Sequence, residues 1–296
     1  MRRRHWNKGE LAFQAANYSL LALLSLLFLV PLLAIVSTSL VGETELMRRG
    51  SFILVPDKLD FSAYRVLLAD GSSLYRAYGI TVARVVVGTA LNLLFTSMLA
   101  YGLSRKGMPG REWMITLIFL TMLFGGGLIP TYLLLKYLHL TDTFWVMIVP
   151  GLISAWNLLI MRNFFSQIPE SLIESATIDG ATPFTILARI VFPLSLPTFA
   201  TIGLFYAVGH WNAWFDATIY INNPELLPVQ VLLRRVVLTM SSQDLNADIM
   251  GALTNKPTPQ SLRGAMIVLT TVPILFVYPF LQKHFIKGAL TGSLKG

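Results

Sequence analysis

Apolar residues along this chain form long runs, not the short periodic stripes that are typical of soluble domains. A helix that crosses a bilayer needs about 20 largely apolar residues, and windows of that length fit several stretches of the sequence. The predicted spans are residues 18–40, 78–103, 114–137, 144–161, 193–221 and 264–281. An even number of spans leaves both termini on one side of the membrane. We therefore predict an all-α membrane protein with one transmembrane domain, residues 1–296.

Composition supports a bilayer protein, because 54% of the 296 residues are apolar and 13% are charged, whereas about a quarter are charged in soluble domains. Three arginines, Arg2, Arg3 and Arg4, precede the first apolar run, as in a secretory signal. That run is longer than a signal core of about 7 to 15 residues, so we interpret it as an uncleaved membrane helix.

Positive charge gathers beside particular span ends, in the pattern that marks cytoplasmic loops. The residues concerned are Arg2, Arg3, Arg4, Lys8, Arg105, Lys106, Arg111, Lys283, Lys287 and Lys295. Segments 41–77 and 222–262 have balanced charge, so we predict that they face outward, where a docking protein can reach them. The loop 164–192 and the tail 282–296 then lie in the cytoplasm. This distribution explains the formal net charge of +8 without nucleic acid.

The loop 164–192 carries the local signals of two short helices joined by a glycine turn. Pro169 suits the first turn of a helix, and Gly180 suits the left-handed residue that ends one. Thr182 is a candidate N-cap, with Pro183 at the first helical position of the second helix. Neither helix is long enough to cross a bilayer. The apolar residues of this bracket, residues 170–189, either pack against the chain's own span ends or need another protein to cover them.

The bracket resembles the EAA loop of permeases in ATP-binding cassette (ABC) importers. The resemblance is carried by Glu174-Ser175-Ala176 and Asp179-Gly180-Ala181, followed by Ile190, Pro193 and Pro197. Most members have alanine where Ser175 stands, which is a small-for-small change. The closing stretch "KGALTGSLKG" is similar to the tail of the smaller membrane subunit of maltose-type carbohydrate importers. The stretch "FGGGLIPTYLLLKYLHLTDTFW" is similar to permeases for complex or acidic oligosaccharides, including alginate.

This resemblance implies a type I ABC importer permease with six transmembrane helices and a cytoplasmic coupling-helix loop, placed in the bacterial cytoplasmic (inner) membrane with both termini in the cytoplasm. The implied partners are a second homologous permease subunit, two ATP-binding cassette subunits, an extracytoplasmic solute-binding protein, an oligosaccharide substrate and membrane lipid. The implied ATPase-coupling residues are Glu170, Glu174, Ser175, Ala176, Asp179, Gly180 and Ala181. The implied tail residues in contact with the ATPase are Gly292, Ser293, Leu294, Lys295 and Gly296.

The sequence supplies no set of residues for catalysis or cofactor binding. It contains no G-x-x-x-x-G-K-[ST] phosphate loop, so ATP and Mg would be bound by partner subunits. The four histidines are scattered and cysteine is absent, which leaves no metal-ligand or thiol set. We therefore predict that the chain is not an enzyme. The alternative is a self-sufficient secondary transporter or channel, which span centres nearly free of charge do not favour.

Polar side chains inside spans are candidates for lining a sugar pathway, because they are costly in hydrocarbon and tend to face a cavity. The candidates are Asn92, Asn157, Tyr206, His210, Asn212 and Trp214. At about 3.6 residues per turn, Tyr206, His210 and Trp214 fall along one helix face, although aromatic rings near a span end fit an interfacial belt equally well. We expect Arg84 to snorkel to the membrane surface and Asp216 to be solvated in a loop.

Overall fold

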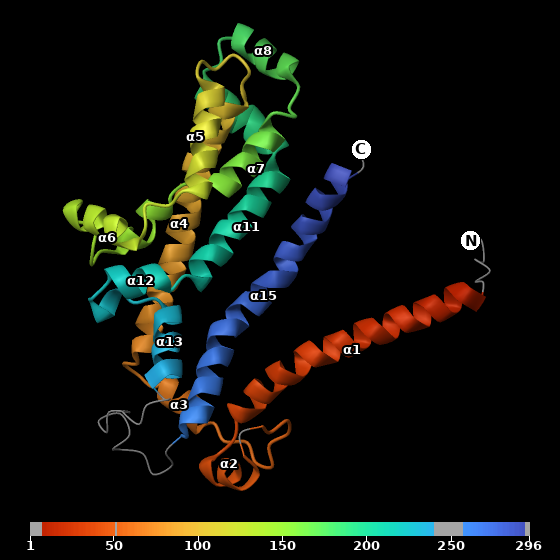
Figure 1. Cartoon of the computed structure of the whole chain (residues 1–296), viewed down its shortest axis with the longest axis vertical. Coiled ribbons are helices and arrows are strands. Elements are labelled where there is room, and N and C mark those ends of the chain that lie inside the picture. The colour runs from red at the N-terminus through yellow and green to blue at the C-terminus, as the bar shows by residue number, and fades with distance from the viewer. Residues whose placement is uncertain (1–7, 51, 240–256, 294–296) are drawn as a thin grey trace. The chain divides into compact units, whose positions relative to one another are not determined.

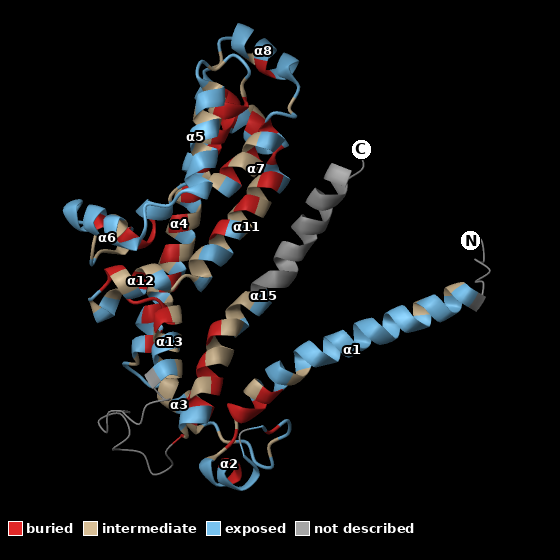
Figure 2. Ribbon diagram, viewed as in Figure 1, coloured by how far each residue is buried: buried red, intermediate tan, exposed pale blue. Residues whose placement is uncertain are grey.

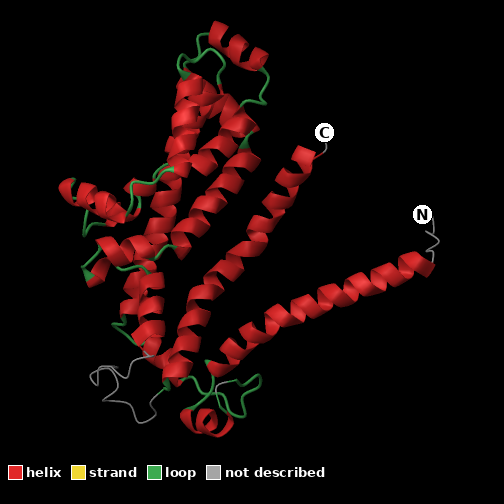
Figure 3. Cartoon of the chain, in the orientation of Figure 1, coloured by secondary structure: helices red, strands yellow, loops and turns green. Residues whose placement is uncertain are grey.

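The computed structural model describes residues 8–50, 52–239 and 257–293, and it contains helices and no strands in these residues (Figure 3). This confirms the predicted all-α fold. The chain divides into two compact units. One consists of Met1–Ser72 with Leu233–Val272, and the other of Ser73–Leu232 with Pro273–Gly296.

The first unit contains α1 (Lys8–Thr38), α2 (Glu43–Arg49) and α3 (Ser62–Leu67), together with the first part of α15 (Pro259–Ser293). The side chains of α1 are exposed over most of its length (Figure 2). An apolar helix of this kind needs lipid or protein to cover it. The end of α1 is fixed by a hydrogen bond between Ser39 Oγ and the Tyr64 hydroxyl (2.7 Å). Ala63 packs with Leu262 and Ala265 of α15.

The loop after α2 is held by ionised groups. Glu45 Oε1 accepts hydrogen bonds from the backbone N–H of Asp57 (2.9 Å) and from Arg49 Nη1 (2.8 Å). Asp57 in turn forms ion pairs with Arg48 and Arg49. The bond from the Asp57 N–H, aided by Arg49, holds the pKa of Glu45 below its ordinary value. The loop therefore needs Glu45 in its charged form.

This arrangement predicts a pH dependence of the loop. Because the pKa of Glu45 is lower in the folded state, its carboxylate stabilises the loop above its ordinary pKa and ceases to do so as the pH falls through the lowered value. We expect amide hydrogen exchange in α2 and residues 52–57, corrected for the intrinsic rate, to accelerate from about pH 5 to about pH 3. The variant Glu45→Gln should lack this pH dependence. Protection that stays constant with pH in the unmodified chain would contradict the prediction.

The second unit is built around α4 (Ser73–Ser104), which packs on α7 (Ala155–Phe165) and α11 (Leu196–Asn212) (Figure 1). The buried core between them consists of Ala100, Tyr101, Leu103, Leu158, Met161, Phe165, Ile173, Ile186, Leu187, Val191, Ile202 and Tyr206. A second cluster joins α12 (Phe215–Tyr220) to η1 (Phe144–Met147) and includes Val146, Met147, Ala217 and Tyr220. The two clusters lie toward opposite ends of α4.

Shorter elements follow or connect these helices. They are α5 (Arg111–Leu123), α6 (Leu128–Tyr137), η2 (Val149–Gly151), α8 (Glu170–Ile178), α9 (Pro183–Ile186), the π-helical turn η3 (Leu187–Val191), α10 (Phe192–Leu194), η4 (Pro224–Leu226) and α13 (Val229–Thr239). The last of them, α13, continues from Leu233 into the first unit. In Figure 1, α8 lies at one end of α4, and α12 lies toward the other. The bracket and the second cluster are therefore separated along α4.

Three of the predicted spans are bent in the structure. Helices Arg111–Leu123 and Leu128–Tyr137 meet at 115°, Phe144–Gly151 and Ala155–Phe165 at 51°, and Pro183–Leu194 and Leu196–Asn212 at 90°. The last bend lies near the start of the predicted span 193–221, and most of its first helix precedes that span. The first bend lies at Gly125-Gly126-Gly127, where Gly127 has a φ of 84°. In the described part of the chain, α1 and α4 are long and apolar enough to cross a membrane unbroken, and up to five segments cross if each bent pair is one span. The predicted span 264–281 lies within α15.

Candidate functional site

The bracket forms the helix, turn and helix that its sequence predicts. α8 ends in a Schellman motif, in which the N–H of Ala181 donates to the C=O of Ala176 (2.9 Å) and the N–H of Gly180 donates to the C=O of Thr177 (3.0 Å). Gly180 has a φ of 80°, the left-handed conformation expected of it. Thr182 caps α9 through its side chain. The chain reversal is thus fixed by local backbone hydrogen bonds.

The two faces of α8 differ in burial (Figure 2). Ile173 is 8% exposed and lies in the core of α4, α7 and α11, with Ala176 packed against the same core. On the opposite face, Glu174 and Ile178 lie four residues apart and are exposed, and Ile178 retains 85% of its accessible surface, while Leu172 is 44% exposed at the flank of the buried face. Exposed apolar side chains of this size favour coverage by another surface. The bracket is therefore anchored on one face and open on the other.

Most of the other residues predicted to contact an ATPase are exposed or terminal, whereas Ala181 is half-buried and packs against the same core as Ala176. Glu170 pairs with Lys106 at 3.4 Å, and both side chains are more than half exposed, so the pair contributes little. Ser175 and Asp179 are exposed on α8 and its C-cap. In the tail, α15 ends with Gly292 and Ser293, whereas Leu294, Lys295 and Gly296 lie outside the described residues. These contacts stay predictions.

Arginines hold the helix ends from which the bracket extends. The C=O of Leu103 accepts hydrogen bonds from Arg111 Nε (3.0 Å) and Arg162 Nε (3.3 Å). The C=O of Phe165 accepts a bond from Arg105 Nη2 (3.1 Å). Carbonyl groups in the last turn of a helix lack helical partners, and positive charge there is favourable. The charges that predict a cytoplasmic loop therefore also fix the ends of α4 and α7.

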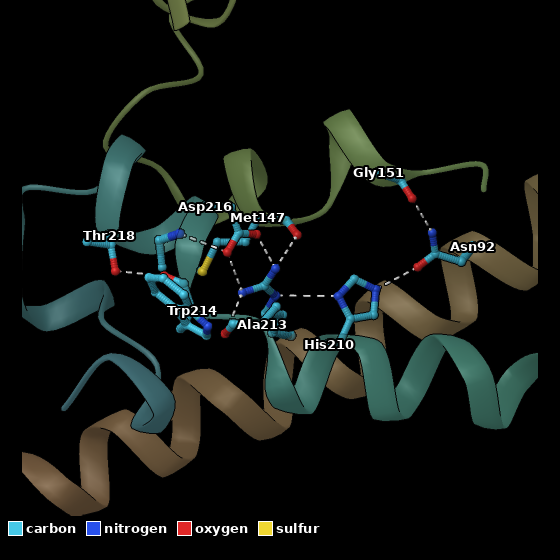
Figure 4. Close-up of polar contacts among 10 residues, drawn as sticks. Asn92, Met147, Gly151, His210, Ala213, Trp214, Asp216 and Thr218 are labelled. Carbon is cyan, nitrogen blue, oxygen red and sulfur yellow. Dashed lines mark hydrogen bonds and ion pairs between the residues drawn. The ribbon is translucent and has the colours of Figure 1, made fainter. Parts of the chain in front are cut away.

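A polar network lies near the other end of α4 (Figure 4). Arg84 is 2% exposed and forms an ion pair with Asp216, just beyond the end of α11. Its Nη1 donates to the C=O of Ala213 (3.5 Å), its Nη2 to the C=O of Met147 (3.1 Å), and its Nε to His210 Nδ1 (3.4 Å). The two Nη groups also donate to the two carboxylate oxygens of Asp216. All five N–H groups of the guanidinium therefore have acceptors.

His210 connects Arg84 to Asn92 by hydrogen bonds through its two ring nitrogens, and Figure 4 shows its contact with Asn92. Nε2 of His210 lies 2.7 Å from Oδ1 of Asn92, whose Nδ2 donates to the C=O of Gly151 (2.9 Å) and of Leu152 (2.7 Å). Because Asn92 uses its nitrogen on these carbonyls, its oxygen accepts the proton of His210 Nε2. Nδ1 of His210 is then the acceptor for Arg84 Nε. The hydrogen bonds run in one direction from Arg84 to the two carbonyls.

Two further pathway candidates are buried beside this network. The Tyr206 hydroxyl accepts a hydrogen bond from the backbone N–H of Ser154 (3.0 Å) and shares another with Thr96 (2.8 Å). Asn157 is 7% exposed, in the first turn of α7. Of the six candidates, Asn92, His210 and Tyr206 therefore take part in side-chain hydrogen bonds that join α4 to α11.

The remaining candidates lie at the end of α11. This helix ends at Asn212, and the next residue, Ala213, has extended backbone geometry. The helical face predicted from Tyr206 to Trp214 is therefore interrupted before Trp214. Asn212 is exposed and its Nδ2 donates to the C=O of Val208 (3.0 Å), while the Trp214 ring stacks edge to face on Phe215. The lining role of all six candidates stays a prediction.

The expectation that Arg84 snorkels was wrong, because its side chain is buried and pairs with Asp216, whose own side chain remains 27% exposed. A signal for this arrangement exists in the sequence of α4. Polar or small residues recur every three or four positions and lie on one buried face, as Thr81, Arg84, Gly88, Asn92 and Thr96. A helix with 3.6 residues per turn places such positions in one stripe. The stripe marks α4 as a helix packed against protein on that face.

Comparisons with known proteins place the chain in a transport family. A family model described as "binding-protein-dependent transport system inner membrane component" matches residues 112–291. The polygalacturonan/rhamnogalacturonan transport system permease protein YtcP of Bacillus subtilis (strain 168) is 42% identical over 96% of this chain and 98% of its own length. Protein LplC of the same organism is 42% identical over 99% and 98%.

A solved structure is similar over nearly the whole chain. It is the crystal structure of a bacterial ABC transporter involved in the import of the acidic polysaccharide alginate. The match has a TM-score of 0.87 and 33% sequence identity, and it covers 96% of this chain and 100% of the other. The type I ABC permease fold expected from the sequence is thereby confirmed. The chain belongs to the family of binding-protein-dependent transport system inner membrane components.

Proposed function

We propose that this chain is the membrane permease subunit of a binding-protein-dependent ABC importer for oligosaccharides, with acidic, uronate-containing oligosaccharides as the substrate class. A second homologous permease subunit completes the pathway, and an extracytoplasmic solute-binding protein delivers the sugar. Two ATP-binding cassette subunits bind ATP and Mg and drive the cycle. The chain lies in the bacterial cytoplasmic membrane with both termini in the cytoplasm, and it catalyses no reaction itself.

The observation that carries this proposal is the half-anchored bracket. Ile173 fixes α8 to the core, while Glu174 and Ile178, four residues apart, present an acidic and apolar face to solvent. A groove with an apolar floor and a basic group would match that face, through burial of Ile178 and a charge-assisted hydrogen bond to Glu174. We assign this groove to the ATPase subunit. The tail residues 292–296 would contact the same subunits.

The substrate class is supported by the proteins that this chain resembles. A relative at 42% identity is named for transport of polygalacturonan and rhamnogalacturonan, and the structural match is named for import of alginate. Sugars with carboxylates need donors, and in this chain all five donors of Arg84 are already used inside the protein. We therefore expect the binding protein to select the charge, and neutral side chains such as Asn212 and Trp214 to contact the sugar ring.

Reconstitution tests both the function and the substrate class. The permease would be purified with its partner permease and ATPase, and placed in liposomes with the binding protein. We expect ATP hydrolysis and uptake to rise with oligogalacturonate or alginate oligosaccharide, and to rise less with a neutral arabino-oligosaccharide. The binding protein without sugar is the control. Stimulation by the neutral sugar alone would overturn the substrate class.

One observation favours the alternative of a self-sufficient transporter: the second unit contains an ionisable pair, Arg84 and Asp216. Pairs of this kind serve as coupling sites in secondary transporters when they can exchange a proton or ion. Here the guanidinium is fully paired and 2% exposed, so it offers no free donor to a cargo ion. Uptake by a homogeneous preparation without any ATPase would overturn the proposed function.

A further inference from the structure

Backbone carbonyl groups are left open where helices of the second unit break. α11 ends at Asn212, with Ala213 as its C-cap, and η1 ends at Met147. η2 ends at Gly151, with Leu152 as its C-cap, immediately before α7. The last carbonyls of a helix have no partner within it, and inside a bilayer water cannot replace that partner. Each break therefore needs hydrogen-bond donors from elsewhere in the chain.

The donors come from one face of α4 and from His210. Arg84 serves the carbonyls of Ala213 and Met147, and Asn92 serves those of Gly151 and Leu152. His210 joins the two donors through its two ring nitrogens, and Asp216 neutralises the guanidinium. We name this set of four side chains, Arg84, Asn92, His210 and Asp216, the relay. It satisfies the break after α11 and the break before α7 together.

These two breaks are the far ends of the helices that hold the bracket. α7 starts just after Leu152 and ends at Phe165, shortly before α8. α11 follows α9, η3 and α10, and ends at the relay. Arg84 lies twenty residues from Ser104, which is about 30 Å along a continuous helix. If α8 is displaced, α7 and α11 can therefore carry the movement to the relay, while α4 stays in place.

We propose that Arg84, Asn92 and His210 are positioning residues for transport, because the relay makes the two helix breaks move as one when the bracket moves. This inference rests on the proposed function. In this proposal the buried pair of Arg84 and Asp216 couples the helices, and it neither binds the cargo nor conducts ions. Discrete hydrogen-bonded arrangements at the ends of rigid helices are a physical route for such coupling. Without the relay, ATP hydrolysis would continue, and less sugar would be moved for each ATP.

Gly88 offers a way to displace the relay without changing its charge. A Cβ added at Gly88 would lie 2.5 Å from Nε2 and 2.8 Å from Cε1 of His210. The variant Gly88→Ala should therefore push the imidazole away from Asn92. Gly79→Ala is the matched control, because it lies on the same helix and its Cβ would meet nothing within 4 Å.

The functional measurement is the amount of sugar taken up per ATP hydrolysed by the full complex in liposomes. We expect this ratio to fall about tenfold in Gly88→Ala and to be unchanged in Gly79→Ala. A purely structural role would lower the amount of complex, and would lower uptake and hydrolysis together without changing their ratio. An unchanged ratio in Gly88→Ala would overturn the proposal.

A pair of substitutions at His210 covers the case in which Gly88→Ala does not assemble. His210→Gln retains one acceptor for Arg84 and one donor for Asn92, so it should keep most of the ratio. His210→Leu fills the same space but forms no hydrogen bonds, so the uptake per ATP hydrolysed should fall. Equal ratios in the two variants would contradict a role for the hydrogen bonds.

A second readout needs no sugar and separates this inference from the proposed function. The chain contains no cysteine, so Val146→Cys provides a single thiol, at a position that is 1% exposed next to Met147. In the purified complex we expect a thiol reagent to label it faster when Gly88→Ala is present, and to leave Ile202→Cys, at a buried site in α11, unlabelled in both backgrounds. If no oligosaccharide stimulates the unmodified complex, the proposed function fails while labelling still tests the relay. Unchanged labelling would show that the relay does not hold the break.

Discussion

Gly180→Val is expected to abolish sugar uptake while the chain still inserts and assembles with its partners. Gly180 has a φ of 80°, and a β-branched side chain in that conformation costs about 1–2 kcal/mol or more. A Cβ at this position would meet no atom within 4 Å, so the cost comes from the backbone and not from a clash. The chain would relieve it by leaving the left-handed region, which breaks the Schellman bonds at the end of α8 and turns the bracket away from the ATPase subunit that we propose it contacts.

Gly180→Asn is the matched variant, because asparagine tolerates the left-handed region better than other residues with side chains. We expect it to retain most of the uptake. The measurement compares uptake, ATP hydrolysis and the amount of purified complex for both variants. Full uptake by Gly180→Val would show that the bracket is only a connection between spans, and that the exposed face of α8 does not transmit motion.

Phe165→Ala is expected to destabilise the second unit by about 3–5 kcal/mol. The Phe165 side chain has no exposed surface, and its ring packs against that of Phe199 with the centroids 5.9 Å apart. Its removal leaves a cavity where α4, α7 and the bracket meet. The C=O of Phe165 would remain available to Arg105, so the loss comes from side-chain packing alone.

The neighbouring Phe164 provides the control for this prediction. It is 41% exposed, and Phe164→Ala should change the stability by no more than about 0.5 kcal/mol in the chain alone. The midpoint of thermal inactivation of the purified complex would report the difference between the two variants. Equal midpoints would mean that this cluster does not limit the stability of the unit.

Local signals explain why the bracket was predictable in detail. Gly180, Thr182 and Pro183 each act on the backbone within a few residues, so a turn and a helix start follow from sequence without knowledge of the rest of the fold. The bends within the spans were harder to predict. A window of about 20 residues averages over a break, so three bent helix pairs have the hydropathy of continuous spans. The glycine triplet at 125–127 was the local sign of the sharpest bend.

The relay depends on contacts between distant parts of the sequence. Arg84 and Asp216 are 132 residues apart, and no local preference of either residue indicates the other. Considered singly, an arginine in the outer part of a span is expected to reach for water, which led to the wrong expectation. The stripe that includes Gly88 and Asn92 was visible at helical spacing and indicated a protein-facing side of α4. The structure was needed to identify the residues that form hydrogen bonds with that side of α4.

The polar stripe of α4 also constrains how the protein is made. Arg84 leaves the ribosome well before His210 and Asp216, which are 126 and 132 residues further along the chain. At about 5 to 20 residues per second, that interval is on the order of ten seconds. During this time Arg84 would lack its partners in the outer part of a membrane helix, where its cost in lipid is below the roughly 2.5–3.5 kcal/mol of an arginine at the helix centre. α4 therefore has reason to remain beside the insertion machinery until α11 is synthesised, whereas the apolar α1 can enter the lipid at once.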